Sequence, residues 1–437
     1  NNVSATNTTR TAELLERQRR VLLPVQTKML FYGDEPLAVA RAAGDWLWDV
    51  EGNEYLDFFG GILTVAIGHC NEEVVAAVSA QIRKAGHTST LYLNEITVEV
   101  AEFLARVTPG RLQHTFFTSS GTEANETAVM AARAHTGNTD IVALRHGYSG
   151  RSAMTMSLTG QSTWRSGGVY DGYVKHVRSP YMGRRPAGMS EDAYLDFLVE
   201  DFEDFLATST DGRIAAFMAE PIQGVGGFQP VPFGYFRRIE PLVRAAGGIM
   251  IIDEVQTGWG RTGGQLCAIE HWGIEPDVMT FAKGIANGAP VGATVMVPEV
   301  AAALQASTLA TYGGNPVSMA QTLATLQYIE RNRLWENAGR QGAKLRAALE
   351  ELQSEHGFIS DVRGMGLMQA IELTDEAGQP DAARANALVA EARNNRLLIG
   401  KGGRYGNSMR IAPMLNASDE VMAEGIERLR RSVAAIA

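Results

Sequence analysis

A serine, a glycine and a threonine follow one apolar run and open a predicted helix. They are Ser120, Gly121 and Thr122, and the helix is expected over residues 123–135. A helix N-terminus offers free N–H groups and the positive end of the helix dipole, so with a hydroxyl and a glycine it can hold a phosphate. Ser120 and Glu123 also form an S-x-x-E capping box, which any helix can use. Taken alone, the segment leaves an anion site and a plain helix cap open.

Two further apolar runs end in residues that could take part in chemistry. Asp253 follows the run 249–252, at the end of a strand where α/β proteins place ligands, and an acid there can pair with a buried cation. Lys283 follows the run 278–282. An amine among apolar residues is poorly hydrated, which lowers its pKa and makes the neutral form available for Schiff-base chemistry. The ordinary alternatives are a loop-capping aspartate and a solvated surface lysine.

Together, the three segments match the needs of pyridoxal 5'-phosphate (PLP). This cofactor requires an anchor for its phosphate, a partner for its pyridinium nitrogen and an amine for its aldehyde. Strand ends on the same edge of one sheet would bring Thr122, Asp253 and Lys283 together. We therefore interpret them as one PLP site and expect no metal ion in it.

The elements that must position these residues are those of an α/β protein. Segments long enough for crossover helices separate several of the short apolar runs, which favours a wound, mostly parallel sheet. The runs read as buried strands are His114–Ser119, Ile141–Leu144, Ile214–Ala219, Ile249–Ile252, Val278–Ala282 and Val291–Val297.

From about Pro316 onward, apolar residues recur at helical spacing over long segments. Two short strand candidates lie among these segments, near Leu398 and at Met409–Ile411. We predict three parts: residues 1–65, an N-terminal segment that packs with the small domain; 66–315, a large PLP-binding domain; and 316–437, a small α+β domain.

Composition narrows the class of protein. The chain has 437 residues and a formal charge of −10, which argues against a nucleic-acid or anionic-membrane partner. No apolar run approaches the roughly 18 residues of a membrane helix. With only Cys70 and Cys267, a disulfide framework is not expected, so the cytoplasm is the predicted compartment. Residues 1–10 are polar and lack the apolar core of a signal peptide, although an upstream targeting peptide that has been removed stays open.

From about Leu37 to Leu429 the sequence resembles the class III aminotransferases, of the fold-type I group of PLP enzymes. The resemblance rests on motifs that are specific in combination: Gly60-Gly61-Ile62 through Gly68-His69, Ser120-Gly121-Thr122-Glu123-Ala124-Asn125, His146-Gly147-Tyr148, Glu220-Pro221, Asp253-Glu254-Val255-Gln256-Thr257-Gly258, Lys283-Gly284 and Thr311-Tyr312-Gly313-Gly314-Asn315-Pro316. It implies ping-pong transfer of an amino group from an amine donor to a 2-oxo acid.

The resemblance also assigns roles to residues. Lys283 would bond to the cofactor aldehyde and shuttle the proton, Asp253 would pair with the pyridinium nitrogen, and Gln256 would hydrogen-bond the phenolic oxygen. Gly121 and Thr122 would hold the phosphate. The remaining implied cofactor contacts are Ser120, Tyr148, which would stack on the ring, Glu220, and Thr311, which would reach the cofactor of a neighbouring subunit in a homodimer, with a tetramer as the alternative.

The same resemblance implies a substrate pocket. Arg410 would bind the α-carboxylate of an amino or oxo acid, Arg151 would hold a distal carboxylate, and Ile62 would line the pocket. One position departs from the 4-aminobutyrate and ornithine branch, which carries an acid where this chain has Val225. Val225 therefore favours the alanine–glyoxylate and β-alanine–pyruvate branch, whereas Arg151 fits 2-oxoglutarate, so the acceptor stays open.

Three other functions compete with transamination. Residues 258–263 fit G-x-G-x-x-G, the mark of a dinucleotide-binding dehydrogenase, but five residues separate them from the strand and no good helix follows. A PLP-dependent phospholyase or decarboxylase would use the same cofactor residues. A binding protein that merely retains the fold is disfavoured because Lys283, Asp253 and Gln256 are all present.

Overall fold

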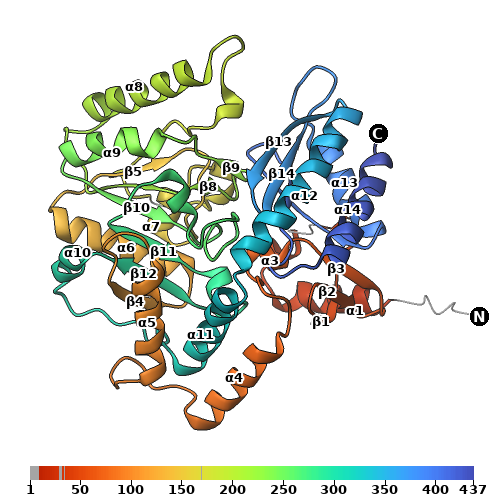
Figure 1. Cartoon of the computed structure of the whole chain (residues 1–437), viewed down its shortest axis with the longest axis horizontal. Helices are drawn as coiled ribbons and strands as arrows, with labels where there is room; N and C mark the ends of the chain where they lie inside the picture. The colour runs from red at the N-terminus through yellow and green to blue at the C-terminus, as the bar shows by residue number, and fades with distance from the viewer. Residues whose placement is uncertain (1–8, 29–31, 34, 169) are drawn as a thin grey trace, which may run out of the picture.

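The computed structural model describes residues 9–28, 32–33, 35–168 and 170–437. Figure 1 shows two bodies side by side: a larger one built on a seven-stranded sheet, and a smaller one formed by the two ends of the chain. The polar start of the chain, apart from Thr9 and Arg10, lies outside the described residues.

The central sheet has the expected mixed but mostly parallel order. Six of its seven strands match the predicted runs; the edge strand β6 was not predicted. Strand β12 runs antiparallel to both of its neighbours, β4 and β11, whereas β11, β10, β7, β5 and β6 are parallel to one another. The order across the sheet is β4 (His114–Thr118), β12 (Gly292–Met296), β11 (Val278–Phe281), β10 (Ile249–Asp253), β7 (Ala216–Ala219), β5 (Ile141–Leu144) and β6 (Val174–Val177).

Helix α6 (Gly121–Thr136) connects β4 to β5 and packs against β12, β11 and β4. It buries a face of small residues, among them Ala124, Ala128 and Ala132, which lets the helix lie close to the strands. Its N-cap is Ser120, whose hydroxyl accepts the N–H of Glu123 at 3.1 Å. The helix start is therefore fixed at the edge of the sheet where β10 and β11 end.

The other helices of the larger body complete its layers. Helices α8 (Glu191–Ser209) and α9 (Tyr235–Ala245) pack against each other on the side of the sheet that Figure 1 shows at the upper left. Smaller elements are α7 (Ala153–Leu158), α10 (Pro298–Ala303), η1 (Ser162–Trp164), η2 (Met182–Arg184), η3 (Ala268–Trp272), η4 (Lys283–Ile285) and the hairpin of β8 (Ile222–Gln223) with β9 (Gln229–Pro230).

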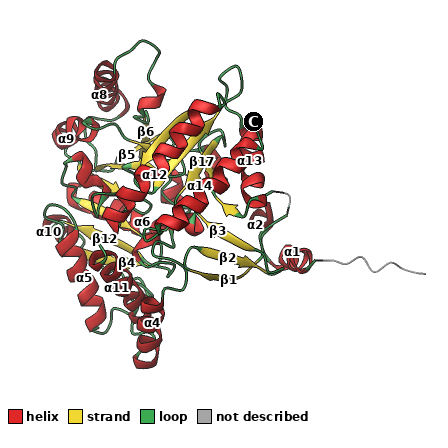
Figure 2. Cartoon of the chain, turned by 45° about the vertical axis from the view of Figure 1, so that its right-hand side comes forward, coloured by secondary structure: helices red, strands yellow, loops and turns green. Residues whose placement is uncertain are grey.

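The smaller body holds an antiparallel sheet that the sequence only partly predicted. Its order is β13 (Ile359–Met365), β14 (Met368–Leu373), β17 (Ser408–Ile411) and β16 (Gly400–Gly402). Both predicted short strands are present: Met409–Ile411 lies in β17, and the one near Leu398 is β15 (Leu397–Leu398), which belongs to the second small sheet. Strands β13, β14 and β16 were not predicted. Strand β13 carries Asp361, Arg363 and Gly364, so it lacks the β-branched run that marks a strand in sequence. Helices α12 (Leu334–Glu355), α13 (Ala382–Asn394) and α14 (Asp419–Ala434) cover it (Figure 2).

The two ends of the chain meet in a second small sheet. Strands β1 (Val39–Ala43), β2 (Trp46–Asp49) and β3 (Glu54–Asp57) form a meander, and β3 pairs in parallel with β15 (Leu397–Leu398). Helices α1 (Arg10–Val21), α2 (Pro24–Lys28) and α3 (Gly60–Leu63) flank this region.

Helix α11 (Pro316–Arg331) packs on α4 (Glu72–Lys84) and α5 (Glu95–Val107), beside the larger body. The boundaries at residues 65 and 315 stay a prediction.

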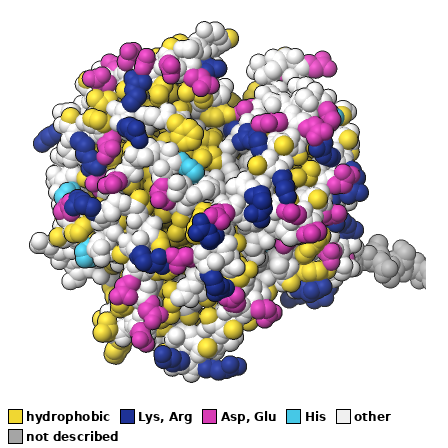
Figure 3. All heavy atoms as spheres, in the orientation of Figure 1, with side chains coloured by type: hydrophobic (Ala, Val, Ile, Leu, Met, Phe, Trp, Pro, Cys, Tyr) yellow, Lys and Arg dark blue, Asp and Glu magenta, His cyan; other side chains and the backbone are white. Residues whose placement is uncertain are grey.

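The surface carries both signs of charge. Figure 3 shows Lys and Arg interspersed with Asp and Glu over the visible face. Among the described helices, none combines the length and apolar character needed to cross a bilayer.

Candidate active site

Lys283 lies where β11 ends, at the start of the short helix η4. Its backbone is in the left-handed region (φ 49°), an uncommon state for a residue with a side chain that often marks a functional position. Its amine makes no hydrogen bond or ion pair with any described residue. Burial, followed by the positive charge of Arg410, lowers the pKa of Lys283 to about 8, against the opposing charges of Asp253 and Glu220. The amine is thus available as a nucleophile near neutral pH.

Asp253 is the last residue of β10 and is 4% exposed. The backbone N–H of Val255 donates to its Oδ1 at 2.9 Å, and Asn125 Nδ2 donates to its Oδ2 at 2.9 Å. Burial raises the pKa of Asp253 to about 6. A buried carboxylate held by only two donors can accept a cation, and one placed there would restore full ionisation.

Asn125 was not among the predicted site residues, although it lies in a quoted motif. It projects from the first turns of α6 and donates both to Asp253 and to the carbonyl of Ser149 at 2.9 Å. It therefore fixes the carboxylate relative to the loop that carries Tyr148. An asparagine early in a helix resembles a capping residue, and its distant partners become visible only when the strands are placed.

Glu220 is a second buried acid behind the site. Its Oε1 accepts the N–H of Tyr148 at 3.0 Å, and its Oε2 accepts the N–H of Gly224 at 2.9 Å. Burial and the nearby charge of Asp253 raise the pKa of Glu220 to about 8. The side chain thus ties the Tyr148 loop to the β8–β9 hairpin.

Gln256 is buried between that hairpin and the site, and its Oε1 has no hydrogen-bond partner among the described residues. A Cβ on Gly224 would lie only 2.2 Å from this oxygen, so the close approach requires glycine. An unpartnered buried amide costs free energy unless a ligand satisfies it.

The start of α6 forms the candidate phosphate cradle. The N–H groups of Gly121 and Thr122 find no acceptor among the described residues, as the first turn of a helix predicts. The Thr122 hydroxyl accepts the N–H of Arg151 at 3.4 Å. Two free donors and a hydroxyl at the positive end of the helix dipole suit a phosphate.

Arg410 is a buried cation on β17, 3% exposed, with no carboxylate paired to it among the described residues. Within the described chain its guanidinium donates only to the carbonyls of Lys401 (2.9 Å) and Gly224 (3.4 Å), and its Nε has no partner there. The rings of Phe59 and Phe228 lie 5.0 and 5.5 Å from it. Burial lowers the pKa of Arg410 to about 10.

The remaining predicted residues lie around this centre. Tyr148 is half-buried, and its ring meets Trp164 edge-on at 5.6 Å. Arg151 is exposed but close enough to act electrostatically on Tyr148. Ile62, 37% exposed in α3, adjoins Leu63, whose carbonyl lies beside Gly284. Thr311 is exposed in the loop between α10 and α11, and within the described chain it reaches none of the buried site residues.

The family of this chain follows from its similarity to known proteins. The model of the class III aminotransferases matches residues 32–433. This chain belongs to the class III aminotransferases. It is 41% identical over 410 residues to the mitochondrial alanine–glyoxylate aminotransferase 2 homolog 2 of Arabidopsis thaliana, covering 92% of this chain and 83% of the relative.

Solved structures of class III enzymes have the same fold. A thermostable (S)-enantioselective omega-transaminase from Thermomicrobium roseum superimposes with a TM-score of 0.89 at 32% identity, over 98% of this chain and 99% of the other. A phospholyase from Arthrobacter, solved with phosphoethanolamine, gives a TM-score of 0.88 at 30% identity over 97% and 99%. The predicted fold-type I fold is thus confirmed, and the chain is a PLP-dependent enzyme.

The residues of this aminotransferase fit the cofactor. Free donors at Gly121 and Thr122, an unpartnered amide at Gln256 and an unpaired amine at Lys283 surround the buried carboxylate of Asp253. The dehydrogenase alternative fails, because the glycines of residues 258–263 form buried turns that pack against Phe281 and α12 rather than opening a helix.

Proposed function

We propose that this aminotransferase moves the amino group of alanine, an ω-amino acid or a similar primary amine to a 2-oxo acid, pyruvate or glyoxylate being the preferred acceptors. The observation that carries the proposal is Arg410, a buried guanidinium without a carboxylate partner among the described residues. A buried cation of this kind is satisfied by an anionic ligand. Its planar fork suits the carboxylate of a 2-oxo acid.

Val225 supports the same choice of acceptor. It is buried in the β8–β9 hairpin, and its carbonyl accepts the N–H of Gly403, beside the strand that carries Arg410. An apolar side chain at this position leaves Arg410 open in both half-reactions. The similarity to an alanine–glyoxylate aminotransferase points in the same direction.

Each residue of the proposed site has a separate role in this reaction. When bound, PLP supplies an electron sink that allows the C–H bond beside the donor nitrogen to ionise. Lys283 Nζ would take that proton and return it, and Asp253 would pair with the positive charge of the pyridinium nitrogen. Gly121, Thr122 and the Ser120 turn would hold the phosphate, Gln256 would satisfy the phenolic oxygen, and Tyr148 would lie against the ring. Glu220 positions the backbone of Tyr148 and Gly224.

A panel of donors crossed with acceptors tests the assignment. Alanine, β-alanine, 4-aminobutyrate and a simple primary amine are each assayed with pyruvate, glyoxylate and 2-oxoglutarate, and the new amino acid is quantified. A kcat/KM that is higher for pyruvate or glyoxylate than for 2-oxoglutarate supports the proposal. Preference for 2-oxoglutarate would instead favour the 4-aminobutyrate or ornithine type, in which Arg151 binds the second carboxylate.

The second candidate function is a phospholyase or decarboxylase. The similarity to an Arthrobacter phospholyase favours it, because the same cofactor residues serve both reactions. Release of phosphate or carbon dioxide without an added oxo acid would establish this function. Stoichiometric appearance of a new amino acid would exclude it.

We also propose a homodimer in which Thr311 completes the partner's site, with a tetramer as the alternative. Thr311 lies beside an exposed apolar patch in which Leu91, Leu93 and Tyr312 are 76%, 93% and 68% exposed. The loop that carries Leu91 and Leu93 contacts the loop of Thr311 through the rings of His87 and Tyr312, whose centroids are 5.5 Å apart.

A mixed-subunit experiment tests the shared site. A dimer made from Lys283→Ala and Thr311→Ala subunits would contain one complete site and one doubly defective site. Mixed dimers more active than either parent variant support sharing, and additive residual activity rejects it.

The free thiols of Cys70 and Cys267 lead us to propose a reducing compartment, the cytoplasm.

A further inference from the structure

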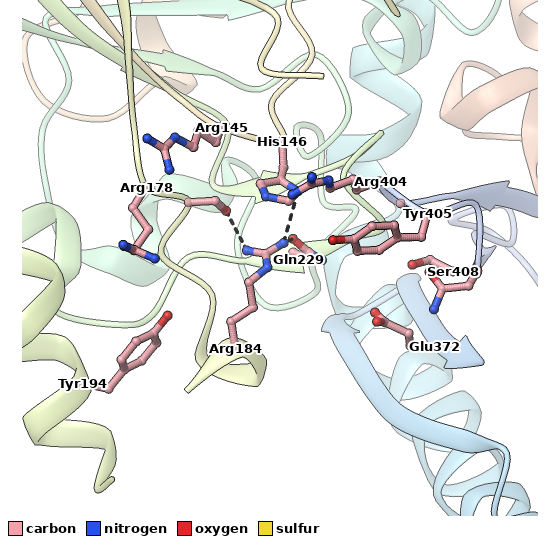
Figure 4. A pocket seen from close by; sticks show the side chains of 13 residues that line it. Arg145, His146, Arg178, Arg184, Tyr194, Gln229, Glu372, Arg404, Tyr405 and Ser408 are labelled. Atoms are coloured by element: carbon pink, nitrogen blue, oxygen red, sulfur yellow. Dashed lines mark hydrogen bonds between the residues drawn. The ribbon is translucent and has the colours of Figure 1, made fainter. Parts of the chain in front are cut away.

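A cavity of about 460 Å³ between the two bodies of the molecule collects basic side chains. Arg145, Arg178, Arg184 and Arg404 line it together with His146 (Figure 4). We call this set of five residues and the cavity they line the arginine cleft. Its size is that of a small-molecule pocket.

Segments that are far apart in the sequence build the arginine cleft. Arg145 and Arg178 directly follow β5 and β6, two paired parallel strands whose carboxyl ends share an edge. Arg184 ends η2. Arg404 comes from the smaller body, in the turn between β16 and β17. Figure 4 shows Arg184, from η2, and Arg404, from the β16–β17 turn, both near His146.

Most of these positive charges are not neutralised. Arg145 and Arg404 form no ion pair with any described residue. Arg184 donates to neutral groups only: Ser179 Oγ at 3.1 Å, His146 Nδ1 at 3.4 Å, and Gln229 Oε1. Of the four arginines, only Arg178 forms an ion pair with a described residue, Asp201, at 3.6 Å. The charge of Glu372 acts on Arg184 without pairing with it.

Glu372 is the one carboxylate among the residues that line the cleft, and it is already engaged. Its Oε2 accepts Arg363 Nη1 at 2.5 Å. Burial and the charges of Arg184, Arg404 and Arg145 lower the pKa of His146 to about 4, so this ring is neutral at pH 7. With Nδ1 accepting from Arg184, its Nε2 is a donor. The cleft thus presents hydrogen-bond donors and three unpaired guanidinium groups.

The arginine cleft is separate from the substrate site. Lys283, Asp253 and Arg410 do not line it. Gln223 on β8 separates the two: its side chain bonds to Ser179 and to the Arg145 carbonyl on the cleft side, while the next residue, Gly224, presents its carbonyl to Arg410.

We propose that the arginine cleft binds a small polyanion with two or more clustered anionic groups, a pyrophosphate or a tricarboxylate, as an effector distinct from the substrates. Three unpaired guanidinium groups match a ligand of about three negative charges, because charge-assisted bonds to clustered oxygens are the strong ones. The cavity has the volume of a small-molecule site and the chain as a whole is acidic, which favours a small ligand over a polymer. The ligand would join the β16–β17 turn to the loop that continues from His146 to Tyr148.

Calorimetric titration of the PLP-loaded enzyme tests the proposal. Pyrophosphate, citrate and, as a monoanion control, acetate are titrated at constant ionic strength set with NaCl, and the unfolding midpoint is followed in parallel. Saturable binding of pyrophosphate or citrate, with a higher midpoint, supports the site. Binding of pyrophosphate alone assigns it to phosphates, and binding of citrate alone assigns it to polycarboxylates. If neither binds more tightly than acetate, the proposal is wrong.

Matched variants locate the binding. Arg145→Ala with Arg404→Ala should weaken the Kd about 10-fold or more, since two charge-assisted bonds are lost. The control, Arg17→Ala with Arg237→Ala, removes two exposed arginines that form no ion pair within the described chain, and it should leave the Kd unchanged. Arg410→Gln should also retain binding. Parent-like binding by the cleft variant, or loss of binding in Arg410→Gln alone, would overturn the proposal.

Discussion

Two buried arginines of the same antiparallel sheet are used in opposite ways. Arg363 on β13 pairs with Asp361 at 2.9 Å and Glu372 at 2.5 Å, and it also donates to Ser408 Oγ at 2.8 Å. Arg410 on β17 has backbone carbonyls and aromatic rings around it and no carboxylate among the described residues. Burial lowers the pKa of both guanidinium groups, but the charges of Tyr181, Glu372 and Asp361 outweigh it and raise the pKa of Arg363, whereas the pKa of Arg410 stays lowered. The charge of Arg363 is therefore neutralised within the fold, whereas that of Arg410 is left unpaired among the described residues, as the proposed carboxylate-binding role requires.

The largest loss of activity is expected from a change at Lys283, and no change at Arg363 or Arg410 should exceed it. Lys283→Ala should abolish transamination with every acceptor while PLP stays bound, because the amine that moves the proton is gone. Steady-state assays and cofactor absorbance after gel filtration measure the two properties. Lys344→Ala, at an exposed lysine paired with Asp419, is the matched control and should keep full activity. Near-normal turnover of Lys283→Ala would refute the proposed role.

Arg410→Gln should lower kcat/KM for the oxo acid about 100-fold or more, since a buried, charge-assisted pair is lost. For an amine donor without a carboxylate, the change should be far smaller. The free energy of unfolding should change by less than about 1 kcal/mol, because no carboxylate is left unpaired. Equal losses for both kinds of substrate would mean that Arg410 acts through the fold.

Arg363→Met should give the reverse pattern. Denaturant titration is expected to show a loss of about 2–4 kcal/mol, less than for a fully buried pair because the side chains of Asp361 and Glu372 are 34% and 27% exposed. The ratio of kcat/KM values for carboxylate and non-carboxylate substrates should stay unchanged in the folded fraction. A selective loss of oxo-acid activity would erase the distinction between the two arginines.

The smallest expected effect is a shift in the pKa of Lys283 caused by the charge of Arg410. Loading of the cofactor-free enzyme with PLP, followed by visible absorbance, should accelerate as the pH rises through about 8, where Lys283 loses its proton. Arg410→Gln removes a positive charge that lowers this pKa, so the midpoint should move to higher pH, by about half a unit to one unit. Arg363→Met should leave it in place. A downward shift in Arg410→Gln would contradict the geometry.

The sequence predicted most of the larger body because its signals are local. Each predicted run of the central sheet is apolar and bounded by polar residues; Asp253 ends β10, and Lys283 lies two residues beyond the end of β11. The β13–β14 hairpin escaped prediction because Arg363 and Gly364 interrupt its apolar pattern. The arginine cleft escaped it as well, since residues 145, 178, 184 and 404 come together only through the pairing of β5 with β6 and the placement of the β16–β17 turn.

The parallel pairing of β3 with β15 constrains how the chain can fold during synthesis. Leu56 and Asp57 pair with Leu397 and Leu398, which leave the ribosome roughly 340 residues later. At about 5–20 residues per second the first strands wait about 20–70 s for their partner. The larger sheet, whose strands all lie between residues 114 and 296, can form in that interval. The edge of β3 in the β1–β3 meander thus stays without its partner strand until most of the chain has been made.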